Sequence, residues 1–185
     1  MFENIKKRRQ DKILRLLSGV ARSKCIAHFD NLQHIGVIFN VGSEQEWNAI
    51  YAFVREMEQK KKQVWCIGFQ RDKQEIDYVF THPQTSICHE KEDFTFIGVP
   101  KEGVTDAFTS RHYDLLIDLT ANHEFFSLFI AGKSLADLKC TYLNTNEPAS
   151  PLLEKIYDLL IRGDEQLDIT NFIGQIKHYL NMIQK

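Results

Sequence analysis

The sequence has few of the residues that mark fibrous, disordered or disulfide-stapled proteins. Its 185 residues include nine Gly, four Pro and four Cys, which argues against collagen-like, low-complexity and disulfide-framework architectures. No run of about eighteen apolar residues occurs, and no apolar stretch follows the charged N-terminus, so we expect neither a membrane-spanning helix nor a secretory signal. With 43% hydrophobic and 26% charged residues, the composition predicts a globular cytoplasmic protein.

The four cysteines are Cys25, Cys66, Cys88 and Cys140, and no two of them have the spacing of a CxxC motif. A chain of this length buries a core large enough to fold without disulfide bonds. We therefore predict reduced thiols. Cys66 and Cys140 lie inside apolar runs, where cysteine behaves as a small hydrophobic residue.

Charge is unevenly distributed along the chain, although the formal net charge is only −2. Residues 1–24 contain eight Lys or Arg and two acidic residues, and they predict an N-terminal basic helical extension before a single domain over residues 25–185. Such asymmetry can indicate contact with nucleic acid or an anionic membrane surface. The alternative is a solvated helix face. The basic residues concerned are Lys6, Lys7, Arg8, Arg9 and Lys12.

Short apolar runs alternate with amphipathic segments along the rest of the chain. Residues 34–40, 64–69, 113–120 and 138–143 predict buried strands, and residues 76–80 and 94–99 predict two weaker ones. Helices are predicted after Ser43, from Phe125, from Pro151 up to Gly163, and from Asp168 to Ile183. The alternation predicts a three-layer, Rossmann-like α/β fold with a mainly parallel sheet of five to six strands and helices on both faces.

In such folds, ligands bind beyond the carboxyl ends of the strands. The loops expected there nominate seven ligand-binding residues: Asn40, Gly42, Ser43, Thr120, Asn122, Asn144 and Asn146. A helix N-terminus at Ser43 can hold a phosphate or carboxylate, whereas Ser43 with Glu46 also fits a plain capping box. Neither a dinucleotide fingerprint nor a P-loop is present, so no cofactor is predicted.

Asp118 and His123 form the best acid and base pair in the sequence, because a carboxylate can orient an imidazole for general base catalysis. No GxSxG motif or other activated nucleophile accompanies them. The alternative is structural: Asp118 caps a backbone turn and His123 opens a helix.

No metal site is predicted. His82, Cys88 and His89 lie close to acidic residues, but their spacing matches no standard zinc site. His112, just before a predicted strand, is interpreted as structural.

Parts of the sequence resemble two groups of known proteins. Residues 113–119 (YDLLIDL), an apolar helix and residues 136–140 (ADLKC) resemble the N-terminal half of heptosyltransferase-type glycosyltransferases, which implies a sugar phosphate or nucleotide phosphate as ligand. Such enzymes hold the sugar-nucleotide donor mainly in a second domain. The overall layout, with a basic first helix and a closing helix over residues 172–183, resembles a group of small uncharacterised bacterial proteins of unknown function. The leading hypothesis is a non-catalytic binding or interaction module for a small phosphorylated ligand or a protein partner. The alternative is a sugar- or nucleotide-phosphate-binding protein or enzyme related to one half of a glycosyltransferase.

Overall fold

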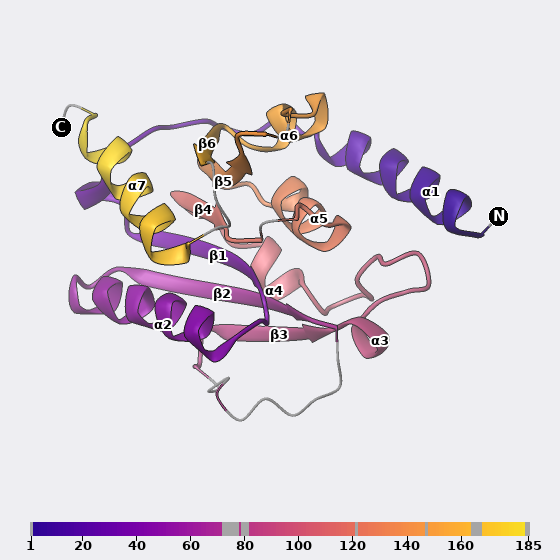
Figure 1. Ribbon diagram of the computed structural model, residues 1–185, viewed down its shortest axis with the longest axis horizontal. Helices are drawn as coiled ribbons and strands as arrows, with labels where there is room; N and C mark the ends of the chain where they lie inside the picture. The colour runs from indigo at the N-terminus through magenta and orange to yellow at the C-terminus, as the bar shows by residue number, and fades with distance from the viewer. Residues whose placement is uncertain are drawn as a thin grey trace.

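A computed structural model of the chain describes residues 2–71, 78, 82–120, 122–146, 148–163 and 168–183. Its centre is a six-stranded parallel sheet with the strand order β3-β2-β1-β4-β5-β6 (Figure 1). The strands are β1 (His34–Asn40), β2 (Gln63–Gln70), β3 (Thr85–His89), β4 (Leu115–Asp118), β5 (Leu138–Asn144) and β6 (Leu159–Gly163). The Rossmann-like α/β prediction is therefore confirmed.

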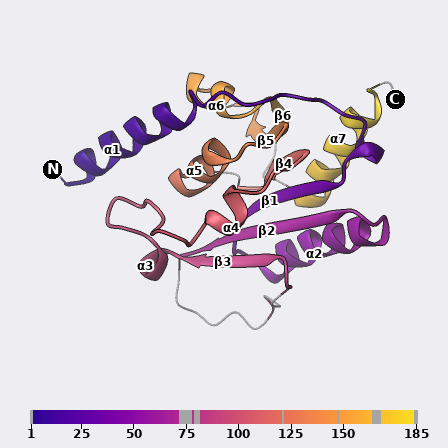
Figure 2. The same ribbon diagram turned by 180° about the vertical axis from the view of Figure 1, so that it is seen from behind.

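Helices cover both faces of the sheet, as continuous apolar strands require. One face carries α2 (Glu44–Gln59), α7 (Ile169–Asn181) and the short 3₁₀ helix η1 (Phe29–Asn31). The other carries α1 (Phe2–Leu17), α4 (Asp106–Thr109), α5 (Phe125–Lys133) and α6 (Pro151–Ile156), with α3 (Glu90–Asp93) after β3. Figures 1 and 2 show the two layers from opposite sides, with α1 extending beyond the sheet.

Each face of the sheet has its own hydrophobic core, because alternate residues of a strand point to opposite faces. In β1, Val37 belongs to the core beneath α2 and α7, whereas Ile38 belongs to the core beneath α5. Gly68 of β2 allows close packing across this sheet, since a Cβ atom there would lie 2.6 Å from the Phe39 ring.

The structure corrects two local predictions. Residues 94–99 are not a strand: they form a turn with one isolated bridge between Phe94 and Pro100, and the strand of this region is β3, at residues 85–89. The predicted helix between residues 151 and 163 ends at Ile156, and residues 159–163 are β6. Of the predicted strand at residues 76–80, only Tyr78 lies within the described residues.

The N-terminal segment is attached to the sheet at two places. In α1, Leu14 is buried against the α5 side, and Leu17 packs directly over Gly132. Beyond the helix, the guanidinium of Arg22 donates hydrogen bonds to the carbonyls of Ala136 and Asp137 at 2.8 and 3.0 Å and pairs with the Asp158 carboxylate. The division at residue 24 stays a prediction.

No helix within the described residues combines the length and the apolar character that a bilayer core requires.

Candidate functional site

The nominated residues lie at the carboxyl edge of the sheet, where β1, β4 and β5 end. They do not form one cluster of interacting side chains. Asp118, Thr120 and His123 belong to a network between β4 and β5, whereas the side-chain oxygens of Ser43 and Asn144 accept hydrogen bonds from N–H groups of their own loops.

Asp118 is completely buried at the end of β4. One carboxylate oxygen accepts hydrogen bonds from the backbone N–H and the hydroxyl of Thr120, at 2.8 and 2.6 Å, and the other accepts from the Tyr157 hydroxyl. Burial raises the pKa of the Asp118 carboxyl, and these donors oppose that rise. Through Thr120 the carboxylate closes the turn after β4, and through Tyr157 it joins this turn to the end of α6. Neither oxygen faces solvent.

His123 is half-buried in the loop between β4 and α5. Its hydrogen bond goes to Thr141 and not to the Asp118 carboxylate, although its charge lowers the pKa of that carboxyl. Its Nε2 lies 3.1 Å from the Thr141 hydroxyl, which donates to the backbone carbonyl of Asp118 at 3.2 Å. Because that hydroxyl has one proton, it accepts from His123, and Nε2 carries the hydrogen. The backbone φ of His123 is +45°, a left-handed conformation that side chains rarely adopt.

The N-terminus of α2 is closed by its own capping box. The Ser43 hydroxyl accepts from the Glu46 N–H at 3.2 Å, and the Glu46 carboxylate accepts from the Ser43 N–H at 2.7 Å. The carboxylate therefore lies where an added anion would bind, and a Cβ atom on Gly42 would lie 2.2 Å from it. Anion binding at Ser43 stays a prediction that would require Glu46 to move.

The remaining nominated residues lie at loop positions of the same edge. Asn144 ends β5, and its side-chain oxygen accepts from the Asn146 N–H at 2.9 Å in a local turn. Asn122 is exposed, and Asn40 is half-buried at the end of β1.

A pocket of about 940 Å³ opens at the carboxyl edge on the face that carries α1 and α5. One wall is α1, and the opposite wall comes from the ends of β2 and β3 with the loop after α3. Its floor includes the start of α5. Of the nominated residues only Lys6, Lys7 and His123 line it, together with Glu3, Gln10, Asp11, Leu14, Phe69, Arg71, Glu90, Lys91, Phe94, Thr95, Phe96, Gly98, Glu124, Phe125, Phe126, Leu128 and Leu152.

Three phenylalanines give this pocket a rigid apolar floor. Phe69 stacks on Phe126 with a centroid distance of 4.9 Å, and Phe94 meets both rings edge-on at 5.3 and 5.7 Å. All three side chains are buried. Such edge-on and offset contacts each stabilise a ring pair by about 0.5–1.5 kcal/mol, so packing among the three rings defines the shape of the floor.

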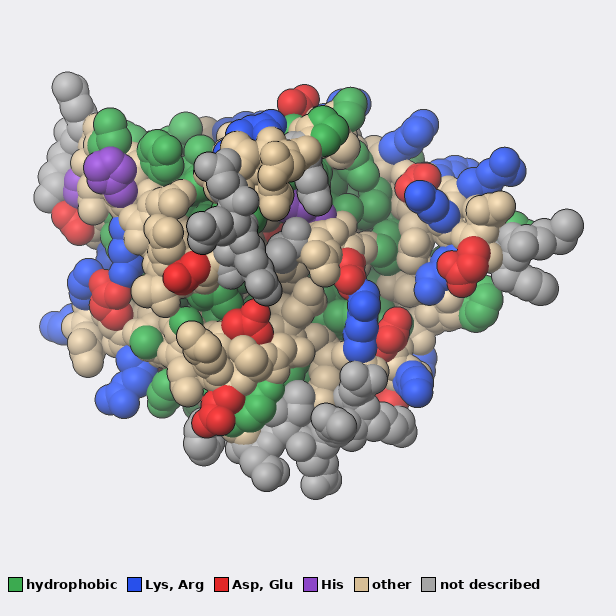
Figure 3. All heavy atoms as spheres, viewed as in Figure 1, with side chains coloured by type: hydrophobic (Ala, Val, Ile, Leu, Met, Phe, Trp, Pro, Cys, Tyr) green, Lys and Arg blue, Asp and Glu red, His purple; other side chains and the backbone are tan. Residues whose placement is uncertain are grey.

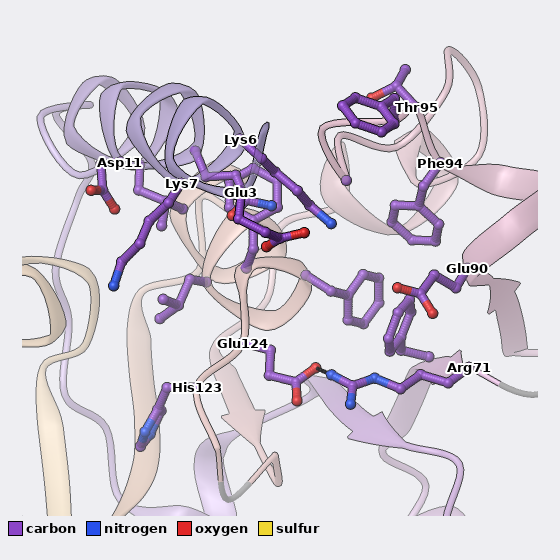
Figure 4. A pocket seen from close by; sticks show the side chains of 18 of the residues that line it. Glu3, Lys6, Lys7, Asp11, Arg71, Glu90, Phe94, Thr95, His123 and Glu124 are labelled. Atoms are coloured by element: carbon purple, nitrogen blue, oxygen red, sulfur yellow. Dashed lines mark hydrogen bonds and ion pairs between the residues drawn. The ribbon is translucent and has the colours of Figure 1, made fainter. Parts of the chain in front are cut away.

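The walls carry charge of both signs, four basic and four acidic side chains. In Figure 4, Lys6 and Glu3 extend from α1 on one side, Glu90 faces them from the other, and Arg71 pairs with Glu124 below. His123 lies apart from Glu90. Figure 3 shows the same mixture on the outside, with basic and acidic side chains interspersed around α1.

Sequence reasoning missed most of this pocket. The residues of its two walls, such as Lys6 and Glu90, are far apart in the sequence, and no local motif joins them. The basic segment Lys6–Lys12 is the one local signal, and its charge predicts contact with nucleic acid or a membrane surface rather than a pocket wall.

Comparison with known proteins identifies a family. The sequence model of a family described as "Family of unknown function (DUF6913)" fits residues 5–183. No curated protein and no solved structure matches the chain. The resemblance to glycosyltransferases is thus unsupported, whereas the resemblance to uncharacterised proteins is confirmed.

Proposed function

The chain belongs to this family of unknown function, and from that premise we propose that it is a non-catalytic binding protein whose small-molecule ligand occupies the pocket beneath α1. The observation that carries the proposal is the pocket itself. Its volume of about 940 Å³ lies in the range of small-molecule sites, about 300–1,000 Å³. It also lies at the carboxyl edge, where ligands of open α/β sheets bind.

The chemistry of the lining favours a ligand with an apolar or aromatic body and a charged head group. The floor of Phe69, Phe94 and Phe126 suits the body. Lys6 and Lys91, on facing walls, form no ion pair within the part of the chain that the structure describes, so a phosphate or carboxylate can reach an unpaired ammonium. Arg71 is already paired with Glu124.

A non-catalytic role is supported by what surrounds the two catalytic candidates. Asp118 is sealed from the pocket, and both of its oxygens accept protein hydrogen bonds. The Nε2 hydrogen of His123 is donated to Thr141. Among the described residues that line the pocket there is neither Ser nor Cys to act as a nucleophile.

The charge balance favours a small molecule over nucleic acid. A protein that binds nucleic acid presents a surface dominated by Lys and Arg. Here Lys6 and Lys7 of α1 share the pocket with Glu3, Asp11 and two further acidic residues. Arg8, Arg9 and Lys12 are exposed on the same helix and remain the residues to test for a weaker, salt-dependent contact.

We also propose a cytoplasmic location. Cys66, Cys88 and Cys140 are buried, and burial raises the pKa of the Cys66 and Cys88 thiols to about 12, so these thiols are chemically inert. Cys25 is an exposed free thiol, which suits a reducing compartment.

A thermal-shift screen of the purified chain tests the binding proposal, because a ligand that binds only the folded state raises the melting temperature. The panel holds nucleotides, sugar phosphates, aromatic carboxylic acids and phosphorylated aromatic compounds, and each hit is also assayed for turnover. Glu90→Trp places an indole in the pocket, and Glu154→Trp, on the exposed side of α6, is the matched control.

We expect hits whose affinity falls at least tenfold in Glu90→Trp and stays unchanged in Glu154→Trp. Equal loss in both variants, or no hit that depends on Glu90, would contradict the pocket as the binding site. Turnover of a bound hit would contradict the non-catalytic role and favour the enzyme alternative.

A further inference from the structure

A second group of polar side chains lies at the amino edge of the sheet, the edge opposite to the pocket. His112, Asp114 and Asp137 each offer one ligand atom, and these three atoms lie within 4.8 Å of one another. His112 and Asp114 come just before β4, and Asp137 comes just before β5. The group is therefore independent of the proposed function at the carboxyl edge.

Backbone pairing fixes the spacing of the group. The Asp137 N–H donates to the Tyr113 carbonyl at 2.9 Å, and the Leu138 N–H donates to the Asp114 carbonyl at 3.2 Å. These bonds extend the parallel ladder between β4 and β5 beyond its end. The three side chains consequently start from backbone positions that cannot move apart without breaking the sheet.

The Asp114 carboxylate is oriented by the start of β1. Its Oδ2 accepts hydrogen bonds from the N–H groups of Gln33 and His34 at 2.6 and 2.8 Å, and its other oxygen accepts none from the residues that the structure describes. Hydrogen bonds of this kind position ligating carboxylates in metal sites. The Asp137 Oδ1 lies 2.9 Å from Nε2 of His112 in a hydrogen bond, so a cation here would replace the shared proton between two atoms that are already close together.

The neighbouring cations are engaged elsewhere. The ammonium of Lys62 donates hydrogen bonds to the carbonyls of Phe29, Asp30 and Leu32. Burial lowers the pKa of Lys62, and the charge of Asp114 partly opposes that shift. Arg22 donates to the Asp137 carbonyl but pairs with the Asp158 carboxylate. Within the described ranges, the Asp114 and Asp137 carboxylates form no ion pair with Lys or Arg, and the two negative charges face one imidazole.

We propose that His112, Asp114 and Asp137 bind one divalent transition-metal cation of the zinc type. An imidazole nitrogen with two carboxylate oxygens suits Zn²⁺ and its neighbours in the first transition row, whereas Mg²⁺ prefers oxygen ligands alone. Zinc bonds to such atoms are about 2.0–2.2 Å long, so the side chains must rotate slightly. The His112 side chain is 58% exposed, which leaves room for that rotation and for water in the remaining coordination positions.

A cation here would join the starts of three strands. His112 and Asp114 hold the start of β4, Asp137 holds the start of β5, and the Asp114 carboxylate already reaches the start of β1. Because the site is built by the folded chain and is absent from the unfolded one, we expect the metal to raise the melting temperature.

The test uses the full chain, stripped of metal and titrated with Zn²⁺ by calorimetry and with Co²⁺ by visible absorption. His112→Ala and Asp137→Asn remove ligands that, within the described part of the chain, form a side-chain hydrogen bond only with each other. His178→Ala, an exposed histidine on α7, is the matched control. Asp114 is left intact because it also caps Gln33 and His34.

We expect one equivalent of Zn²⁺ to bind in the wild type and in His178→Ala, with affinity at least tenfold weaker in His112→Ala and in Asp137→Asn. Mg²⁺ should bind far more weakly. The exposed thiol of Cys25 lies on the segment beside Asp137, since its N–H donates to the Asp137 carbonyl, so Cys25→Ser is included. No binding, equal affinity in all variants, or binding lost in Cys25→Ser with a thiolate band in the Co²⁺ spectrum would overturn the proposal.

Discussion

The Tyr157 hydroxyl donates a hydrogen bond to the Asp118 carboxylate, and both residues are buried. Tyr157 follows α6 and Asp118 ends β4, so this bond joins elements from distant parts of the chain. It also explains why the best acid in the sequence is not presented to a ligand. The carboxylate is held by protein donors on both oxygens.

Replacing Tyr157 by Phe tests the stabilising role of this bond. Burial raises the pKa of Asp118 in the folded chain above its value in the unfolded chain, so the folded state loses stability as the pH rises between these two pKa values. Removing the Tyr157 donor raises the folded-state pKa further and widens that pH range. We expect a loss of about 1–3 kcal/mol in unfolding free energy, larger at pH 7 than at pH 4. Urea denaturation measures it, with the exposed Tyr179→Phe as the control. Equal stability of the two variants at pH 7 would show that the bond contributes nothing.

Lys139 provides a pH-dependent prediction, because it is a buried lysine in β5. Burial lowers its pKa to about 7, with a further contribution from Arg22. Between pH 7 and about 10 the unfolded chain therefore binds more protons than the folded one, and stability rises with pH.

The substitution Lys139→Met fills a similar volume without a charge. We expect the wild type to gain stability relative to this variant, on the order of a few kcal/mol, as the pH rises from 7 to 10. Chemical denaturation at several pH values gives the difference. Parallel curves for the two proteins would exclude Lys139 as the titrating group.

Arg22 and Lys24 pair with the same carboxylate, that of Asp158, but differ in burial. The Arg22 side chain is 6% exposed, whereas the Lys24 side chain is 61% exposed. Removing one partner of a buried pair costs about 3–5 kcal/mol, and an exposed pair contributes about 0–1 kcal/mol. We expect Arg22→Met to lower the unfolding free energy by at least about 2 kcal/mol more than Lys24→Met in the same assay. Similar losses would mean that solvent reaches both pairs equally.

Gly132 sets the distance between α5 and α1. A Cβ atom at this position would lie 3.0 Å from the Cβ of Leu17, whereas a Cβ atom at Gly174 of α7 would meet nothing within 4 Å. Gly→Ala in an exposed helix stabilises by about 1 kcal/mol, and we expect this gain in Gly174→Ala. Gly132→Ala should not be stabilised in this way, because its methyl group pushes against Leu17 of α1. We therefore expect faster amide hydrogen exchange in α1 of this variant. Unchanged exchange would show that α1 tolerates the extra methyl group.

The sequence predicts the central strands well because they are buried on both faces. β1 has an uninterrupted apolar centre, and β5 is buried along almost its whole length although it contains Lys139 and Thr141. β3 was missed because it lies at the sheet edge, and the sequence Thr-Ser-Ile-Cys-His has only one fully buried residue. The sequence predicts one helix in place of α6 and β6, because Leu159 and Leu160 continue the helical spacing of the apolar residues in α6. Neither Gly nor Pro separates the two elements.

The candidate sites were harder to predict than the fold. The position of the pocket at the carboxyl edge follows from the parallel strands, and this rule correctly predicts His123 as a residue near the pocket. The pocket wall formed by α1 depends on the packing of Leu14 and Leu17 over α5. The group at the amino edge depends on the register between β4 and β5. Neither contact leaves a local pattern in the sequence.

The position of α1 has a practical consequence for anyone who handles this protein. The two ends of the chain lie on opposite sides of the molecule (Figures 1 and 2), and Glu3 and Lys6 belong to the pocket wall. A purification tag joined ahead of α1 would therefore begin close to the pocket wall and compete with small molecules in a screen. A tag joined beyond α7 would leave that entrance open.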